Sequence, residues 1–317
     1  MNDPSSDLFC TTEIEKAVDH IRAGRLIAFP TETVYGLGAD ATNADAVATI
    51  YAVKERPSFN PLIIHVANTQ AAEGLVIFDD RARALAENYW PGALTLVLPR
   101  QPDCPVSPLA GAGLNTLAIR IPGHALALKF LEAVDLPIAA PSANRSGAVS
   151  PTTAAHVRES LGDTVDLILD DGPCQIGLES TSIDLTGKVP SLLRVGGIIT
   201  ELLERQLGEL QIVAEDDTSP KAPGMLTRHY ATSIPLRMGA LELHDGEALL
   251  AFGGRTLGPA PAICNLSRGG DLKEAAANLF DMMHQLDKPE YTGIAVMEIP
   301  DTGLGRTIND RLRRASK

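Results

Sequence analysis

Only 4% of the 317 residues are aromatic, and the four cysteines are scattered, with no two in a CxxC pair. A buried core must therefore be built mainly from Leu, Ile, Val and Ala, and the 44% of hydrophobic residues can supply one. Cysteines without the spacing of zinc ligands argue against a structural zinc site and against a disulfide framework. We expect reduced thiols and a cytoplasmic protein.

Long apolar runs are also missing, since none approaches the roughly 20 residues that a membrane-spanning helix needs. The N-terminal residues MNDPSSD lack the pattern of a signal peptide, and we expect no contact with a membrane. The net charge of −13 works against nucleic acids, whose phosphates are bound by Lys and Arg. We therefore expect direct tRNA binding to be weak or absent, although the basic residues 311–317 leave a local basic patch open.

The common nucleotide-binding and catalytic motifs are absent too. The chain has no GxxxxGKS/T, GxGxxG, HExxH or GxSxG segment, and no spacing indicates a catalytic triad. Any nucleotide chemistry must therefore use another phosphate cradle.

The length suits one large domain or two ordinary ones, and residues 1–213 predict an α/β domain. Helices are predicted after a capping box at Thr12 and Glu15, after Asn43, and near residues 80–89, 124–134, 152–161 and 200–207. Because several predicted strands follow one another without a helix, the sheet should be mixed. The predicted strands are short apolar runs bounded by Gly, Pro or polar residues, at 26–30, 61–66, 94–99, 117–122, 137–141, 167–172 and 180–185.

Residues 214–233 break this pattern, because they are charged and then rich in Pro and Gly. We predict that they form an interdomain linker. Its last part holds Arg228, His229 and Tyr230, which a simple tether does not need. These three residues either fold over the site as a lid that excludes water or dock against a domain surface. In residues 234–317 the pattern predicts a strand, a helix and a strand, in that order. We therefore predict a smaller C-terminal α/β domain.

Two cations, Lys54 and Arg56, lie just after a predicted helix, and Pro57 stiffens the chain that follows. A guanidinium can bind phosphate oxygens through two parallel hydrogen bonds, while an ammonium acts as a point charge. The pair can therefore clamp a triphosphate. The alternative is two solvated surface charges.

Arg120 and His65 each lie inside an apolar run that predicts a strand. An Arg in such a place needs a partner, because burying its charge alone is prohibitive. A substrate carboxylate is one possible partner, and an internal Asp or Glu is the other. A lone His in a strand is more often a core residue whose hydrogen bonds are satisfied.

Polar residues follow two of the predicted strands. Thr31, Glu32 and Thr33 come directly after 26–30, where ligands of α/β sheets often bind, and a glycine-rich turn is predicted after them. The segment PSAN (141–144), with Ser150 nearby, offers hydroxyl and amide groups near a helix N-terminus, which binds anions through free N–H groups. Capping of turns and helices is the alternative for both groups.

Taken together, these segments resemble the YrdC-type threonylcarbamoyl-AMP synthases. The last two matching segments are similar to the interdomain linker and the last helix of that family's long, two-domain form. The resemblance implies a YrdC-like twisted mixed sheet with flanking helices and a Rossmann-like C-terminal domain. The segments are FPTETVYGLG (29–38) with KERPSFNPLIIHV (54–66), TLAIRIPGH (116–124), LPIAAPSANRSGAVSPTTAAHV (136–157), SPKAPGMLTRHYAT (219–232) and GLGRTINDRLRRAS (303–316).

The resemblance also implies roles for individual residues. It implies neither an acid–base catalyst nor a metal ligand: Lys54 and Arg56 would neutralise charge, and Mg²⁺ would come with ATP. The implied contacts of L-threonine are Thr33, His65, Arg120, Ala140 and Ser180, with Thr181 as the alternative to Ser180. The implied contacts of ATP are Lys54, Arg56, Asn60, Thr116, Ser142, Asn144, Ser150, Arg194 and Tyr230.

By the same resemblance, the chain would convert L-threonine, bicarbonate or CO₂, and ATP into L-threonylcarbamoyladenylate and pyrophosphate. Partner proteins would then transfer the threonylcarbamoyl group to an adenosine in tRNA. The alternative is an RNA-binding or ribosome-maturation factor on the same fold, which requires a basic concave surface. A hydrogenase-maturation carbamoyltransferase would carry additional cysteine-rich zinc modules, which this chain lacks.

Overall fold

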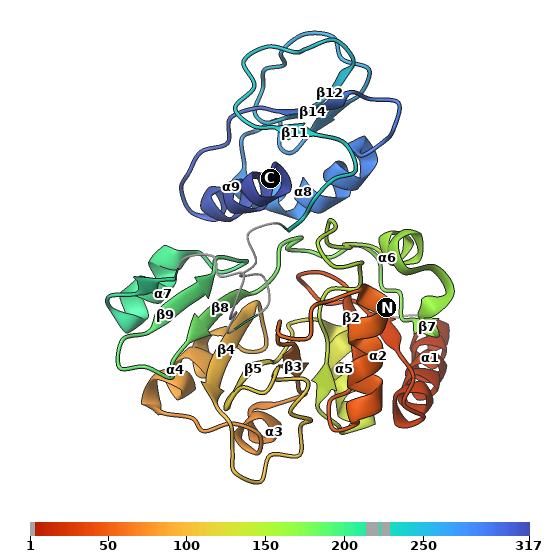
Figure 1. Cartoon of the computed structure of the whole chain (residues 1–317), viewed down its shortest axis with the longest axis vertical. Helices are drawn as coiled ribbons and strands as arrows, with labels where there is room; N and C mark the ends of the chain where they lie inside the picture. The colour runs from red at the N-terminus through yellow and green to blue at the C-terminus, as the bar shows by residue number, and fades with distance from the viewer. Residues whose placement is uncertain (1–3, 214–221, 223–228) are drawn as a thin grey trace.

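The computed structural model describes residues 4–213, 222 and 229–317, which fold into two α/β units, one above the other in Figure 1. The larger, N-terminal unit has a ten-stranded sheet with the order β10-β9-β8-β4-β5-β3-β6-β2-β1-β7. The smaller, C-terminal unit has a four-stranded sheet with the order β11-β14-β12-β13. Within these described ranges, we find no helix that has both the length and the apolar content to cross a lipid bilayer.

The larger sheet is mixed, as predicted. The pairs β3–β5 and β4–β8 are parallel, whereas β4–β5, β3–β6 and β2–β6 are antiparallel. In the parallel pair β3–β5, His65 lies opposite Arg120, so the two side chains share one face of the sheet. The strands are β1 Ile27–Phe29, β2 Gly36–Asp40, β3 Ile63–His65, β4 Leu94–Pro99, β5 Thr116–Arg120, β6 Ile138–Ala139, β7 Leu167–Ile168, β8 Thr181–Asp184, β9 Ser191–Arg194 and β10 Gln211–Ile212.

The prediction of a glycine-rich turn before Asp40 is wrong, because this segment forms strand β2. A Cβ atom on Gly38 would lie 3.0 Å from Cε1 of Phe29 and 3.1 Å from a methyl group of Ile138. The strand passes so close to these side chains that only glycine fits without a shift. Here glycine marks a close approach of backbone to a neighbouring side chain.

Helices cover both faces of the larger sheet. Apolar side chains of α1 and α5 pack with Phe29 and Ile138 in one cluster, and α2, α4 and α6 contribute to a larger core on the other face. Asn43 caps α2 as predicted, accepting hydrogen bonds from the N–H groups of Asp45 and Ala46. The helices are α1 Pro4–Arg22, α2 Ala44–Lys54, α3 Thr69–Glu73, α4 Asp80–Tyr89, α5 Ala125–Val134, α6 Ala154–Leu161 and α7 Thr200–Leu207.

The predicted start of α1 at Thr12 is wrong, because the helix begins at Pro4. Proline is favoured at the first position of a helix, where its missing N–H group would have no helical partner in any case. The helix ends at Arg22, and Gly24 follows with a φ of +74°.

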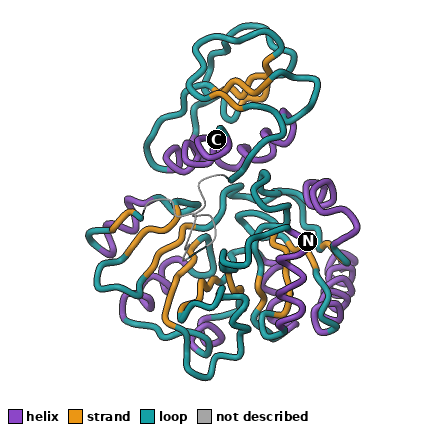
Figure 2. Tube along the Cα trace, in the orientation of Figure 1, coloured by secondary structure: helices purple, strands orange, loops and turns teal. Residues whose placement is uncertain are grey.

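The smaller sheet is entirely parallel, and Figure 2 shows its strands on the side of α8 and α9 that faces away from the larger unit. Val34, Val149 and Leu178 of the larger unit belong to the same apolar cluster as residues of α8 and α9. The two units therefore share a core. The elements of the smaller unit are β11 Leu236–Arg237, β12 Glu247–Ala251, β13 Ile263–Asn265, α8 Leu272–Leu286, β14 Gly293–Val296 and α9 Leu304–Ala315.

Candidate functional site

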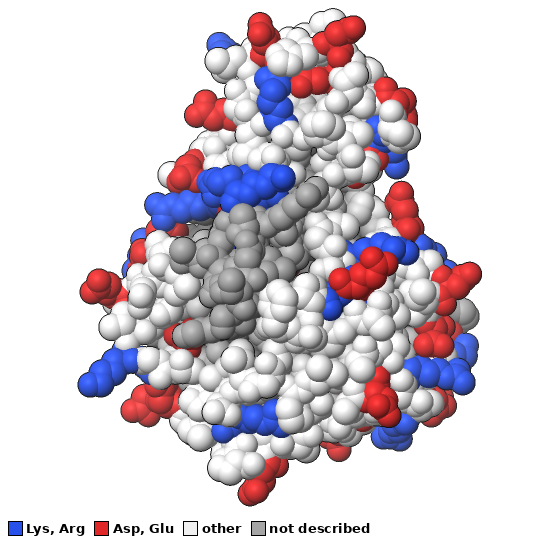
Figure 3. All heavy atoms as spheres, viewed as in Figure 1, with Lys and Arg blue, Asp and Glu red and all other residues white. Residues whose placement is uncertain are grey.

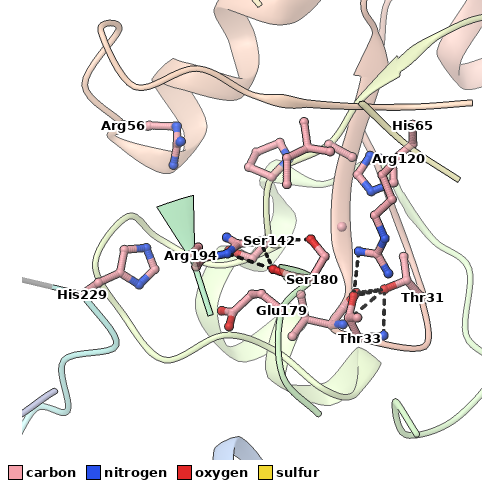
Figure 4. A pocket seen from close by; sticks show the side chains of 15 residues that line it. Thr31, Thr33, Arg56, His65, Arg120, Ser142, Glu179, Ser180, Arg194 and His229 are labelled. Atoms are coloured by element: carbon pink, nitrogen blue, oxygen red, sulfur yellow. Dashed lines mark hydrogen bonds between the residues drawn. The ribbon is translucent and has the colours of Figure 1, made fainter. Parts of the chain in front are cut away.

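A polar pocket lies where the ends of β3, β5, β8 and β9 meet the chain that follows β1 and β6 (Figure 4). His65, Arg120 and Thr33 lie on one side of the view, and Arg56 and His229 lie on the other. Ser180, Glu179 and Arg194 lie between these groups. Those residues implied by the resemblance that line the pocket are Thr33, Arg56, His65, Arg120, Ala140, Ser142, Ser180 and Arg194.

Arg120 is buried and paired with a carboxylate of the protein. Its Nη2 atom lies 2.7 Å from Oε1 of Glu32, its Nη1 atom donates to the Thr33 hydroxyl at 2.8 Å, and its Nε atom donates to the carbonyl of Gly92 at 3.1 Å. The internal partner left open by the sequence is therefore Glu32. Among the described residues these three bonds use three of the five guanidinium N–H groups, which leaves two for a ligand carboxylate.

His65 lies beside Arg120 and is almost fully buried. Its ring meets the edge of Phe29, with 6.0 Å between the centroids, and its Nδ1 atom has no hydrogen-bond partner in the described part of the chain. Burial and the charge of Arg120 lower the pKa of His65 to about 3. The ring is therefore neutral at physiological pH, with one polar atom available to a ligand.

The hydroxyl residues of the pocket divide into caps and wall residues. Thr31 caps its own turn, since its hydroxyl accepts from the N–H groups of Thr33 and Val34. Ser180 lines the pocket and lies 2.7 Å from the Thr95 hydroxyl. The Thr181 hydroxyl points elsewhere, donating to the carbonyl of Ile198. Of the two residues left open by the sequence, the structure places Ser180 on the pocket wall.

The alternative of solvated surface charges does not hold for Lys54 and Arg56, because both are buried. Lys54 donates to the carbonyls of Ser142 and Asn144, directly behind the pocket wall. Burial and the nearby Arg56 lower the pKa of Lys54 well below its usual range. Arg56 lines the pocket and donates to the carbonyls of Asn60 and Pro61, at 3.1 and 2.9 Å.

Several residues implied for ATP lie behind or beside the pocket rather than on its wall. Asn60 is fully buried, and neither polar atom of its side chain has a partner among the described residues. Buried amides are normally satisfied, so this one marks a place for a ligand or water. Asn144 has an unpartnered Oδ1 atom. Thr116 begins β5 opposite Pro99, and the Ser150 hydroxyl donates to Glu179 at 2.6 Å.

Tyr230 docks against the smaller unit. Docking against a domain surface is the second of the two alternatives that the sequence leaves open for this residue. Its ring stacks on Phe280 of α8 at 5.4 Å, and its side chain is fully buried in the cluster shared by the two units. An aromatic ring gains more from this apolar surface than from a polar pocket. The neighbouring His229 lines the pocket instead. Arg228 and most of the predicted linker lie outside the described residues.

Glu179 and Arg311 are site residues that the sequence did not indicate. Glu179 lines the pocket, and its second carboxylate oxygen accepts from Nε of Arg311 in α9 at 2.9 Å. Burial alone would raise the pKa of Glu179, but Arg311, Arg194 and the Ser150 hydroxyl together outweigh it and lower the pKa to about 2. The partners are 132 positions apart in the chain, and no local pattern could have linked them.

The pocket therefore combines three arginines with one carboxylate that is already neutralised. Arg56 and Arg194 suit a polyanion, whereas Arg120 with Thr33, Ser180 and neutral His65 suits a small carboxylate with further polar groups. Across the described residues no cluster of His, Cys, Asp and Glu could hold a metal ion. The arrangement can bind and orient two ligands side by side.

The buried histidines predict a loss of stability in mild acid. Burial lowers the pKa of both His65 and His229 to about 3, whereas an unfolded His titrates near 6.5. The unfolded chain therefore binds more protons as the pH falls below about 6.5, and each histidine should cost about 1 kcal/mol of unfolding free energy per pH unit. Glu179 does not add to this pH dependence above about pH 4.5. Its lowered pKa contributes to the free energy of unfolding, and that contribution is lost only below the pKa of an unfolded Glu.

Urea unfolding of the ligand-free protein between about pH 6.5 and 4.5 would measure this slope. The double variant His65→Gln/His229→Gln should show a flatter dependence. The matched control is His244→Gln, because the His244 side chain is 60% exposed. A wild-type free energy that stays constant over this range would show that the two rings are not held neutral.

Two family descriptions match this chain. Residues 19–196 match the family of Sua5, YciO and YrdC, described as "Telomere recombination". Residues 198–317 match "Threonylcarbamoyl-AMP synthase, C-terminal domain".

Two similar proteins match this chain over both units, and a third matches part of it. Threonylcarbamoyl-AMP synthase of Bacillus subtilis is 40% identical, over 96% of this chain and 93% of its own length. The crystal structure of Pyrococcus abyssi Sua5 complexed with L-threonine is similar over 96% of this chain and 94% of its own, with a TM-score of 0.88 and 40% identity. The crystal structure of E. coli YciO covers 58% of this chain at 25% identity, with a TM-score of 0.53.

Proposed function

This chain belongs to the threonylcarbamoyl-AMP synthase family, and we propose that it makes L-threonylcarbamoyladenylate and pyrophosphate from L-threonine, bicarbonate or CO₂, and ATP. The observation that carries the proposal is the grouping of two kinds of receptor in one pocket. Arg120, Thr33 and Ser180 suit an amino acid, and Arg56 and Arg194 beside them suit a nucleotide. The relative from P. abyssi was crystallised with L-threonine.

For the amino acid, we assign the carboxylate of L-threonine to Arg120. The Glu32 pair fixes the orientation of the guanidinium and leaves two N–H groups for the ligand. The Thr33 and Ser180 hydroxyls, the backbone of Ala140 and the neutral ring of His65 would contact the remaining polar groups of the substrate. Because His65 is neutral, it does not repel the ammonium group before carbamate formation.

For the nucleotide, we assign the phosphates to Arg56 and Arg194, with Ser142 on the same wall. Lys54 supports this wall from behind by holding the carbonyls of Ser142 and Asn144. The unpartnered amide of Asn60 fits a further polar contact of the nucleotide. Mg²⁺ bound to the phosphates would neutralise their charge when ATP binds. Among the described side chains that line the pocket, only Glu179 carries a carboxylate, and both its oxygens are already engaged.

The chemistry proceeds in two steps. The amine of threonine first attacks the carbon of CO₂ and loses a proton, which gives a carbamate. A carbamate oxygen then attacks the α-phosphorus of ATP, and the bond to the β,γ-phosphates breaks to release pyrophosphate. Both steps depend on placing two bound reactants in line and on neutralising charge, more than on an acid or base. The arginines of the pocket provide both.

The product is an activated carbamoyl group that water can destroy, so it would be consumed by proteins that transfer the group to tRNA. Direct binding of tRNA is not part of the proposal. Figure 3 shows acidic and basic side chains mixed over one face of the molecule, and the net charge is −13. An RNA-binding factor would instead need a continuous basic surface.

Pyrophosphate release tests the proposed function. With ATP and Mg²⁺ present, release should require L-threonine and bicarbonate together, because neither alone can form the carbamate that attacks ATP. Omitting each in turn, and replacing L-threonine by L-valine of similar shape, gives the matched controls. Equal release without threonine would reject the assignment, and mass spectrometry of the adenylate would confirm it.

A further inference from the structure

Helix α9 of the smaller unit sends one side chain into the larger unit, next to the pocket. Arg311 is fully buried, and its Nε atom donates to Oε2 of Glu179 at 2.9 Å. Its Nη2 atom donates to the carbonyl of Val195 at 2.7 Å, and its Nη1 atom bonds to Asp310. The guanidinium lies over the ring of Tyr230, 5.0 Å from the centroid. A residue of the C-terminal unit therefore contacts two segments of the N-terminal unit.

Those two segments carry residues of the pocket wall. Glu179 directly precedes Ser180, and Val195 directly follows Arg194. Arg194 ties the segments together, since its guanidinium donates to the carbonyl of Ser180 at 2.9 Å and to its hydroxyl at 3.1 Å (Figure 4).

A second residue of α9 supports the same place. The Thr307 hydroxyl donates to the carbonyl of Gly196 at 3.1 Å, one position beyond the carbonyl held by Arg311. Helix α9 thus donates hydrogen bonds to two successive carbonyls in the turn after β9, and a further one to the carboxylate of Glu179.

Stability alone does not require a guanidinium at this position. Replacing a buried ion pair by apolar residues of similar volume is often neutral or stabilising, and the two units already share an apolar core. A guanidinium can do two further things here. It fixes the direction of the Glu179 carboxylate, and it cancels a negative charge on the wall of a pocket that suits a polyanion.

We propose that Arg311 is a positioning residue of the substrate pocket, which neutralises Glu179 and holds it and the turn after β9 so that Ser180 and Arg194 face the ligands. The C-terminal unit thereby becomes part of the site, because docking of α9 completes the wall. The identity of the ligands rests on the proposed function, whereas the geometric role of Arg311 does not.

The variant Arg311→Met tests the proposal. It retains the apolar volume but removes the cation bonded to Glu179, which leaves more negative charge beside the nucleotide phosphates. We expect ATP affinity to fall by at least about tenfold, because close charge pairs commonly couple by more than that factor. Arg311→Lys should recover part of the affinity. Arg313→Met is the matched control, because Arg313 is exposed on the same helix.

A second variant separates positioning and charge from simple stability. In Arg311→Met/Glu179→Gln the negative charge is gone but the turn after β9 still lacks Arg311, so ATP affinity should recover in part relative to Arg311→Met. The pH dependence gives a further readout. The charged or titratable groups that act on Glu179 are Arg311, Arg194, His229 and Tyr230. Loss of Arg311 removes one of the charges that lower the pKa of Glu179, so this pKa rises, and ATP binding by Arg311→Met should improve relative to the wild type as the pH is lowered.

The affinity for ATP is measured by titration calorimetry, and the melting temperature by circular dichroism, on the same full-length samples. The proposal is overturned if Arg311→Met binds ATP like Arg313→Met, or if the Glu179→Gln replacement gives no recovery in a folded double variant. A wild type that binds ATP but releases no pyrophosphate would reject the proposed function and leave this test intact, because the calorimetric comparison does not need turnover.

Discussion

Arg120→Ala is expected to weaken L-threonine binding by roughly 2–5 kcal/mol, the range for removing one member of a buried charged pair. The change removes the N–H groups assigned to the substrate carboxylate. It also leaves the carboxylate of Glu32 buried without its cation. This side chain is 7% exposed, and its Oε2 atom already lacks a partner among the described residues. ATP affinity should change far less, because Arg56 and Arg194 remain in place.

Titration calorimetry with each ligand measures the two affinities separately. The double variant Arg120→Ala/Glu32→Gln separates the two consequences of the change. It should recover stability, because the stranded charge is gone, but it should not recover threonine binding. Equal losses of threonine and ATP affinity in Arg120→Ala would show that this residue only maintains the structure.

Gly196→Ala is expected to disrupt the pocket through a collision of the added methyl group with backbone atoms. A Cβ atom at this position would lie 2.3 Å from the amide nitrogen of Thr181 and 2.4 Å from the carbonyl carbon of Ser180. Neither atom can swing away as a flexible side chain would. The turn after β9 cannot retreat either, because α9 holds it from behind. We expect a loss of about 3 kcal/mol or more, the upper end for overpacking, together with a large rise in the KM for threonine.

Chemical unfolding and steady-state kinetics with L-threonine measure the two effects of Gly196→Ala. Gly187→Ala is the matched control, because its nearest neighbour would be a carbonyl oxygen at 3.5 Å, an ordinary contact. A Gly196→Ala protein with the stability and KM of this control would mean that the turn after β9 moves freely.

The sequence predicted most of the fold because its patterns are local. Alternating short apolar runs and caps such as Asn43 gave the order of strands and helices, and the lack of helices between several runs predicted a mixed sheet. The failures have physical reasons. Strand β2 was predicted as a turn, because its glycines reflect crowding by Phe29, which is visible only once the strands are assembled.

Site residues were predicted only where a single segment of the sequence showed an unusual residue or pattern. Arg120 drew attention as a charge in an apolar strand, and its partner was correctly limited to a ligand or an internal carboxylate. Glu179 and Arg311 gave no signal, because each looks like an ordinary surface charge until folding brings them together across 132 positions. Tyr230 was open to two readings, since a sequence cannot show which surface a ring meets.

The position of α9 in the chain has a consequence for synthesis. Every strand that builds the pocket comes before residue 195, whereas the support for its wall comes from residues 307 and 311. A growing chain on the ribosome therefore makes the strands of the pocket first and the support of its wall more than 100 residues later. During that interval Glu179 has no cation from α9. A product truncated before Arg311 therefore lacks this support for Glu179 and for the turn after β9.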